Sequence, residues 1–293
     1  MSQQGQGSLQ MPENEVAIPR IVWLLWFQGL DRAPHVVRKC HESWLVRNPG
    51  WRVVLLDEST LPGFGTINYS SETVRAVPPT MRSDLVRLDL LAHHGGVWAD
   101  ATCLCVHSLD DWLPKYMRSG FFAFSRPGRD RLLASWFLAA EPGNILPTHL
   151  FSQLYSYWNS HIFHNGERKF TVDVLQRMLR GSARTRAWWF SRPVAEWLGV
   201  HPRNFVVHYA FEKLIRDDTG CAEVWNRTPK VSANPSLRPY RADLLAPLSR
   251  ELRSEIDRQD VPVYKTSWHM DDDKIPASSV LAYLLDMPTT ERP

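Results

Sequence analysis

The sequence predicts an α/β fold built on a mostly parallel sheet, and three stretches near its start carry this prediction. Ile21 to Phe27 is a continuous apolar run. Unbroken rather than alternating hydrophobicity is typical of a strand buried on both faces. Residues 34–47 then show helical spacing of apolar side chains, and residues 51–56 form a second apolar run. A strand, a helix and a strand in this order favour a parallel pair with a right-handed crossover.

Length and composition agree with one large α/β domain. The 293 residues are 44% hydrophobic and include 13 Trp, enough to fill a sizeable core. The net charge of +3 is modest, which argues against a nucleic-acid partner because such proteins usually carry a clustered basic face. The four Cys show no CxxC pair and no metal-ligand spacing. Buried, reduced thiols are therefore expected.

We expect a single domain over residues 18–288, between a disordered N-terminal tail at 1–17 and a short tail at 289–293. The first residues lack the apolar core of a signal peptide. The longest apolar run is far shorter than the ~20 residues that cross a bilayer. The expected location is cytoplasmic, with at most peripheral contact at the inner face of a membrane. Residues 141–235 are expected to form a helical and loop-rich lobe on the acceptor side.

The stretch from Met81 to Leu104 is the first candidate for a functional site. Its helical pattern carries Asp84 and Arg87, which are three residues apart and therefore neighbours on one face. A surface ion pair is the alternative explanation for them. A short strand follows and ends at Asp100. Ligands of open α/β sheets bind outside the carboxyl ends of strands, so Asp100 is a site candidate.

Three expectations concern local structure around and after this stretch. Thr80 is a suitable N-cap for the helix that carries Asp84. The short apolar run Val206 to Tyr209 suggests a strand, and Leu237 to Asp257 suggests one charged helix.

The polar groups of the candidate site suit an oxygen-rich ligand. Carboxylates accept hydrogen bonds from sugar hydroxyls and, with a partner, hold a hard cation. Arg87 could pair with Asp84 or Asp100, or reach a phosphate. Lys265 and His269 offer further donors late in the chain. Since a Trp face can stack on a base or a sugar ring, these groups together meet the needs of an enzyme that uses a nucleotide-activated sugar.

Five stretches resemble the capsular polysaccharide synthesis family of glycosyltransferases, which is related to a wider clan of DxD-type sugar transferases. They read IPRIVWLLWFQGLDRAP, HESWLVRNPGWRVVLLDE, SDLVRLDLLAHHGGVWADAT, SWFLAAEPGNIL and VYKTSWH, and they are spread over residues 18 to 269. The combination is more specific than any one piece. The resemblance implies a GT-A fold, in which a Rossmann-like, mostly parallel sheet is flanked by helices.

The resemblance also implies roles for individual residues. Trp26 resembles the aromatic residue that stacks on the nucleotide base. Asp84 and Arg87 resemble the pair that contacts the ribose and the donor sugar, and Asp100 matches the first Asp of DxD. Lys265, Ser267 and Trp268 resemble the late cluster around the diphosphate, and Thr102 is the last of the implied donor-binding residues. Asp100, Arg87 and Lys265 are the implied catalytic residues.

One position departs from the clan, because Thr102 stands where the second Asp of DxD is expected. A neutral hydroxyl is a poorer ligand for Mn²⁺ or Mg²⁺ than a carboxylate. One possibility is that Asp100 holds the cation together with His269 or Asp271. The other is that Lys265 and Arg87 neutralise the diphosphate without a metal.

The resemblance implies a hexosyltransferase that moves a sugar, with retention of configuration, from a nucleotide-diphosphate donor in capsule-like polysaccharide biosynthesis. A UDP-sugar is the expected donor, and a saccharide or lipid-linked saccharide is the expected acceptor. The alternative is a catalytically inactive protein that binds nucleotide sugars or carbohydrates on the same scaffold, and Thr102 keeps this alternative open. A Rossmann-type dehydrogenase fits poorly, because no GxGxxG follows the first strand.

Overall fold

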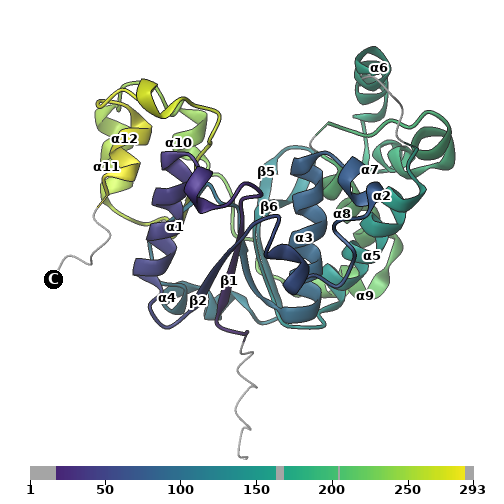
Figure 1. Cartoon of the computed structure of the whole chain (residues 1–293), viewed down its shortest axis with the longest axis horizontal. Helices are drawn as coiled ribbons and strands as arrows, with labels where there is room; N and C mark the ends of the chain where they lie inside the picture. Colours follow the sequence, from purple (N-terminus) through teal and green to yellow (C-terminus); the bar gives the residue numbers. More distant parts are fainter. Residues whose placement is uncertain (1–17, 163–167, 204, 288–293) are drawn as a thin grey trace, which may run out of the picture.

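The computed structural model describes residues 18–162, 168–203 and 205–287, so the two tails expected at 1–17 and 289–293 lie outside the described residues. Within these ranges the chain forms a five-stranded sheet flanked by helices (Figure 1), which confirms the predicted α/β class.

The strands are β1 (Ile21–Leu25), β2 (Arg52–Leu56), β3 (Gly96–Ala99), β4 (Cys103–Cys105), β5 (Phe121–Gly128), β6 (Arg131–Ala140) and β7 (Val263–Lys265). The helices are α1 (His35–Arg47), α2 (Glu72–Ala76), α3 (Pro79–His94), α4 (Leu109–Trp112), α5 (Ile145–Ser160), α6 (Lys169–Leu179), α7 (Ala183–Arg186), α8 (Val206–Asp217), α9 (Thr219–Arg227), α10 (Arg238–Arg241), α11 (Arg250–Asp257) and α12 (Val280–Leu285).

The order of strands in the main sheet is β2-β1-β3-β6-β5. Strand β1 is parallel to β2 on one side and to β3 on the other. Strand β6 is antiparallel to both β3 and β5, so β1, β2, β3 and β5 share one direction. The chain therefore moves to opposite sides of β1 when it forms β2 and β3. Such a switch point opens a crevice at the carboxyl ends of the strands.

Strand β1 is buried on both faces, as its continuous hydrophobicity predicted. Trp23 and Leu25 belong to the core that the sheet forms with α3, α5 and α8. Val22 and Leu24 belong to a second core, which includes residues of α1 and α4. Figure 1 shows α1 and α3 on opposite sides of the sheet.

A separate pair of strands brings the late chain to the end of β3. After Asp100 the chain leaves the main sheet, and β4 pairs antiparallel with β7. In this register Cys103 lies opposite Lys265. Lys265 therefore lies beside Thr102 although more than 160 residues separate the two.

Three local predictions were wrong. The run Val206–Tyr209 begins helix α8 rather than a strand, because an apolar run of four residues cannot distinguish the two by itself. The single helix expected from Leu237 to Asp257 is two helices, α10 and α11, separated by a segment that contains Pro247. Thr80 lies inside α3, whose N-cap is Pro78.

The described helices give no support for a membrane-crossing segment. None of them is both long enough and apolar enough to span a bilayer.

Two glycines allow the sharp turn from α3 into β3. Gly95 and Gly96 have φ values of 64° and 89°, in the left-handed region that glycine adopts with little strain. Gly96 also lies close to its neighbour on β1, since a Cβ there would fall 2.4 Å from Ile21 Cγ2 and 2.6 Å from Ile21 O. This contact fixes where β3 begins, and hence where Asp100 lies.

We expect Gly96→Ala to lower the free energy of unfolding by about 3 kcal/mol, the sum of backbone strain and a steric clash. The matched control is Gly143→Ala. Gly143 has a similar φ of 73°, but a Cβ there would have nothing within 4 Å, so only the strain of about 1 kcal/mol applies. Urea unfolding of both variants measures the difference. Equal losses would contradict the close approach of the β3 start to β1.

Candidate functional site

A cavity of about 630 Å³ lies at the carboxyl ends of β1 and β3. It therefore occupies the crevice that the strand order creates. Seven of the residues predicted from the sequence line it: Trp26, Asp84, Arg87, Asp100, Thr102, Lys265 and Trp268. The structure thus brings together side chains from β1, α3, β3 and β7 in one concave site.

Arg87 is held in a fixed orientation by groups from three elements. Its guanidinium lies 3.3 Å from Asp84 and 3.2 Å from Asp100. It also donates hydrogen bonds to the Ser135 carbonyl of β6 at 2.5 Å and to Ser83 Oγ at 3.1 Å. Asp84 and Arg87 are both buried. The alternative of a solvated surface ion pair is therefore wrong.

Asp100 is the centre of this network. Its Oδ1 is shared by Arg87 and by the indole N–H of Trp98, which donates at 3.1 Å. Its Oδ2 lies 3.3 Å from Lys265 Nζ. The side chain keeps 26% of its surface exposed, so a ligand in the cavity can reach it.

Lys265 connects Asp100 to Thr102. Its ammonium donates a hydrogen bond to Thr102 Oγ1 and pairs with Asp100. The cation of Lys265 therefore bonds the same two side chains that an Asp-x-Asp motif offers to a metal ion. As arranged here, Asp100 and Thr102 do not fit a divalent cation, because a protein ammonium already bonds both.

The other residues predicted near a cation are placed differently. Neither His269 nor Asp271 is among the described residues that line the cavity. The His269 ring packs against Trp268, with ring centroids 4.1 Å apart. Asp271 pairs with Lys274 at 2.9 Å. Ser267 also lies outside the cavity lining, and its Oγ accepts from the His269 N–H at 3.3 Å.

Burial and the neighbouring charges shift the pKa values of Asp84, Asp100 and Lys265. Burial raises the pKa of Asp84 to about 7, with Arg87 opposing the shift and Asp100 adding to it. Burial acts on Asp100 in the same direction, but Arg87 and Lys265 outweigh it and hold the pKa of Asp100 below its ordinary value. Burial would lower the pKa of Lys265, but Asp100 raises it above the ordinary value. Asp100 is thus ionised and Lys265 cationic at neutral pH.

Two tryptophans form an aromatic corner in the cavity lining. Trp26 follows β1 and meets Trp268 edge to face, with centroids 5.4 Å apart and planes at 82°. Trp26 also packs beside Val37 and Ala101, whereas Trp268 is exposed. Among the described residues, the buried Nε1 of Trp26 has no hydrogen-bond acceptor. The corner therefore offers apolar ring surface to a ligand, chiefly from the exposed Trp268.

Among the lining residues that the sequence did not identify, three bear on the charge or shape of the cavity. Arg32 adds a further cation to its lining, Ser135 supplies the carbonyl that orients Arg87, and Val207 closes one side from α8. The position of Arg32 just after the carboxyl end of β1 was a usable signal. Ser135 and Val207 had no such signal. Every residue has a backbone carbonyl, and a valine that lines a cavity cannot be told from a core valine by sequence.

We predict that the free energy of unfolding of the wild type falls as pH rises from about 4 to 7. That of an Asp84→Asn variant should not show this fall. The unfolded carboxyl ionises near pH 4, but the folded one keeps its proton until about pH 7. The folded state therefore binds more protons in this window, and the free energy of unfolding falls as pH rises. The loss is roughly 2–4 kcal/mol, and stability is level above this window.

Chemical denaturation of both chains between pH 5 and pH 8 checks this. Asp273→Asn, at an exposed carboxyl, is the control and should follow the wild type. Parallel curves for the wild type and Asp84→Asn would rule out the raised pKa.

The chain is similar to one protein family and to several glycosyltransferases. A model of the capsular polysaccharide synthesis protein family matches residues 3–166. O-glycosyltransferase braB of Annulohypoxylon truncatum is 30% identical over 143 residues, which are 42% of this chain and 34% of that protein. An uncharacterized glycosyltransferase of Acanthamoeba polyphaga mimivirus, L373, is 29% identical over 100 residues, which are 33% of this chain and 40% of that protein. These matches span well under half of either relative.

A solved structure named PaToxG Glycosyltransferase aligns with 91% of this chain and 87% of its own, at 12% identity and a TM-score of 0.36. A likeness this low carries no weight for fold or function. The family model, in contrast, covers more than half of the 293 residues. The chain therefore belongs to the capsular polysaccharide synthesis protein family.

Proposed function

We propose that the protein is a glycosyltransferase that moves a sugar from a nucleotide-diphosphate sugar to a saccharide acceptor. The observation that carries the proposal is the cavity itself, in which the aromatic corner and the Asp84–Arg87–Asp100–Lys265 network line one concave site. A nucleotide sugar has the matching parts: a flat base, sugar hydroxyls and a doubly charged diphosphate. The named relatives of the chain are glycosyltransferases, which supports the same reaction class.

The aromatic corner suits the nucleotide base. A Trp face gains dispersion and stacking energy from a flat heterocycle, and both Trp26 and Trp268 line the cavity. Of the nucleotide sugars whose base could stack there, we propose a UDP-sugar as the donor.

The charged network suits the sugar and the diphosphate. Asp100 can accept hydrogen bonds from sugar hydroxyls. Arg87, Lys265 and Arg32 supply positive charge to the same cavity. Because Lys265 bonds Asp100 and Thr102, we propose that these cations, rather than Mn²⁺ or Mg²⁺, stabilise the charge that develops on the leaving diphosphate. Fixed donors aimed at developing charge are among the largest contributions to catalysis.

In the proposed reaction the bond between the anomeric carbon and the diphosphate oxygen breaks, and its electron pair stays on the diphosphate. The sugar passes through an oxocarbenium-like state. An acceptor hydroxyl oxygen then bonds to the anomeric carbon, and its proton goes to a diphosphate oxygen. We propose that the acceptor enters on the face the diphosphate leaves, which retains the configuration. The residues of the chain position both partners.

A capsule-like polysaccharide is the proposed product, in line with the family to which the chain belongs. The second candidate, an inactive protein that binds nucleotide sugars, rests on Thr102 in place of an acidic residue. The two candidates differ in one observable, which is the release of free nucleotide.

We predict that the wild type releases a nucleoside diphosphate from at least one nucleotide sugar, and that Asp100→Asn lowers this rate about 100-fold or more. The variant keeps the shape of the side chain but removes its charge. Asp110→Asn is the control, since Asp110 is an exposed carboxyl paired with Arg20, and it should retain full activity. A panel of donors, assayed with and without saccharide acceptors, provides the measurement.

Unchanged circular dichroism would show that both variants are folded. Full activity of Asp100→Asn would reject the assignment of the site. Binding of a nucleotide sugar without any release, with or without acceptors, would favour the inactive binding protein.

A further inference from the structure

Most of the exposed large hydrophobic side chains of the described residues lie between 162 and 198. We call the described residues of this range the lobe, and it contains α6, α7 and the 3₁₀ helix η4 (Ala187–Phe190). Figure 1 shows α6 at the edge of the molecule, away from the sheet. Exposed apolar side chains that gather on one surface often mark a binding site.

Helix α6 has two apolar faces, and only one is covered. Val172, Leu175 and Leu179 pack against the small core formed around Trp189 and Val194. Phe170, Val174 and Met178, spaced four residues apart, lie on another face and are 82%, 41% and 67% exposed. We call these three residues the outer stripe. Among the described residues, no element covers it.

The segment that carries the outer stripe is basic. Residues 168–198 include seven basic and two acidic side chains, although the whole chain carries only +3. Arg177 lies three residues from Val174, on the same side of α6. Within the described residues, Arg177, Arg180 and Arg184 take part in no ion pair. Apolar and basic groups therefore occur together on one amphipathic helix and its surroundings.

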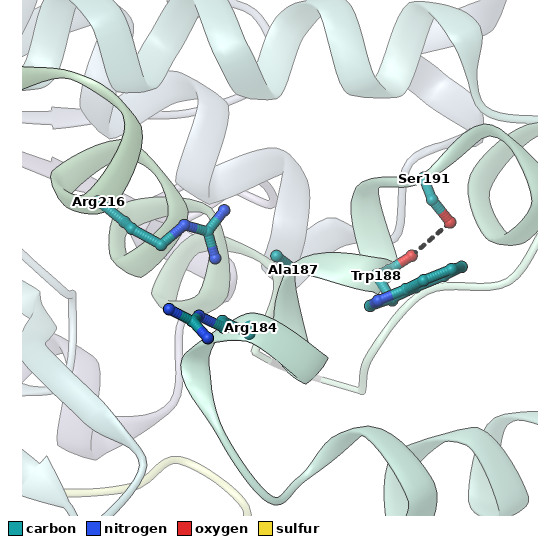
Figure 2. A pocket seen from close by; sticks show the side chains of 5 residues that line it. All are labelled: Arg184, Ala187, Trp188, Ser191 and Arg216. Carbon is teal, nitrogen blue, oxygen red and sulfur yellow. Dashed lines mark hydrogen bonds between the residues drawn. The ribbon is translucent and has the colours of Figure 1, made fainter.

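A shallow pocket of about 360 Å³ on the same lobe has the same composition. Figure 2 shows the guanidinium groups of Arg184 and Arg216 on one side of it and the exposed indole of Trp188 on the other. Tryptophan is enriched where proteins meet the boundary between lipid headgroups and acyl chains.

We propose that this lobe docks on an anionic lipid bilayer, with the outer stripe at the headgroup–acyl boundary and the arginines against lipid phosphates. An amphipathic helix with large apolar groups and flanking cations binds such surfaces by burial and by charge attraction. A second copy of the chain fits less well, because pairing through the outer stripe would bring two basic lobes together.

Helix α8 connects this lobe to the proposed active site. Tyr209 packs in the small core of the lobe, whereas Val207 lines the cavity. A docked lobe therefore holds the cavity close to the bilayer. This favours a lipid-linked saccharide over a free one as the acceptor, and only this last step rests on the proposed function.

Co-sedimentation with vesicles tests the docking surface. The wild type should sediment with vesicles of phosphatidylcholine mixed with phosphatidylglycerol, and roughly tenfold more weakly with phosphatidylcholine alone. Phe170→Ser combined with Met178→Ser should weaken binding to the mixed vesicles by roughly tenfold or more. The matched control is Leu45→Ser with Val46→Ser, because these side chains of α1 are also exposed, at 48% and 42%, and should leave binding unchanged.

A labelling experiment covers the case in which the serine variants fail to fold. All four native Cys are buried, so a polarity-sensitive dye can be attached at Met178→Cys or, as a control, at Val46→Cys. The mixed vesicles should shift the emission of the first dye to the blue and leave the second unchanged. Absence of sedimentation, equal responses of the two dyes, or a dimer that only the stripe variant disrupts would overturn the proposal. None of these outcomes bears on nucleotide release, so they leave the proposed reaction untouched.

Discussion

The Asp100 carboxylate, held between the guanidinium of Arg87 and the ammonium of Lys265, is the interaction on which the site depends. Arg87 arrives on α3 and Lys265 on β7, so one carboxylate joins two parts of the chain that the sheet alone would not bring together. Three partly or fully buried charges need one another, because a buried charge without a partner costs several kcal/mol. The turn at Gly95-Gly96 and the β4–β7 register serve to place these groups at one point.

The same network accounts for the division of charge within the cavity. Asp100 keeps its negative charge because two cations face it. Asp84 has only a share of Arg87 and lies near Asp100, so its carboxyl holds a proton until near-neutral pH. The network thus contains one firmly ionised acid, one acid that titrates near pH 7 and two cations. A diphosphate that entered this cavity would meet fixed positive charge without requiring the side chains to reorganise.

Much of this could be predicted from sequence, because the relevant signals are local. Continuous apolar runs predicted β1 and β2, and a three-residue spacing predicted that Asp84 and Arg87 share a face. The position of Asp100 at the end of β3 followed from the glycine stop before it. The strand expected at Val206 failed for the opposite reason, since four apolar residues carry too little periodicity and the packing of α8 decides the outcome. The bond from Lys265 to Thr102 was not predictable either, because it depends on the register of two strands far apart in the sequence.

In the proposed reaction, the protein cations at Asp100 bind the diphosphate of a nucleotide donor. Calorimetric titration with a nucleoside diphosphate such as UDP, in the presence of excess EDTA, tests this most directly. We expect binding in EDTA that Mn²⁺ does not strengthen, and a loss of affinity of roughly tenfold or more when Lys265 is replaced by Met. Binding that appears only after Mn²⁺ is added, and that Lys265→Met leaves unchanged, would contradict it.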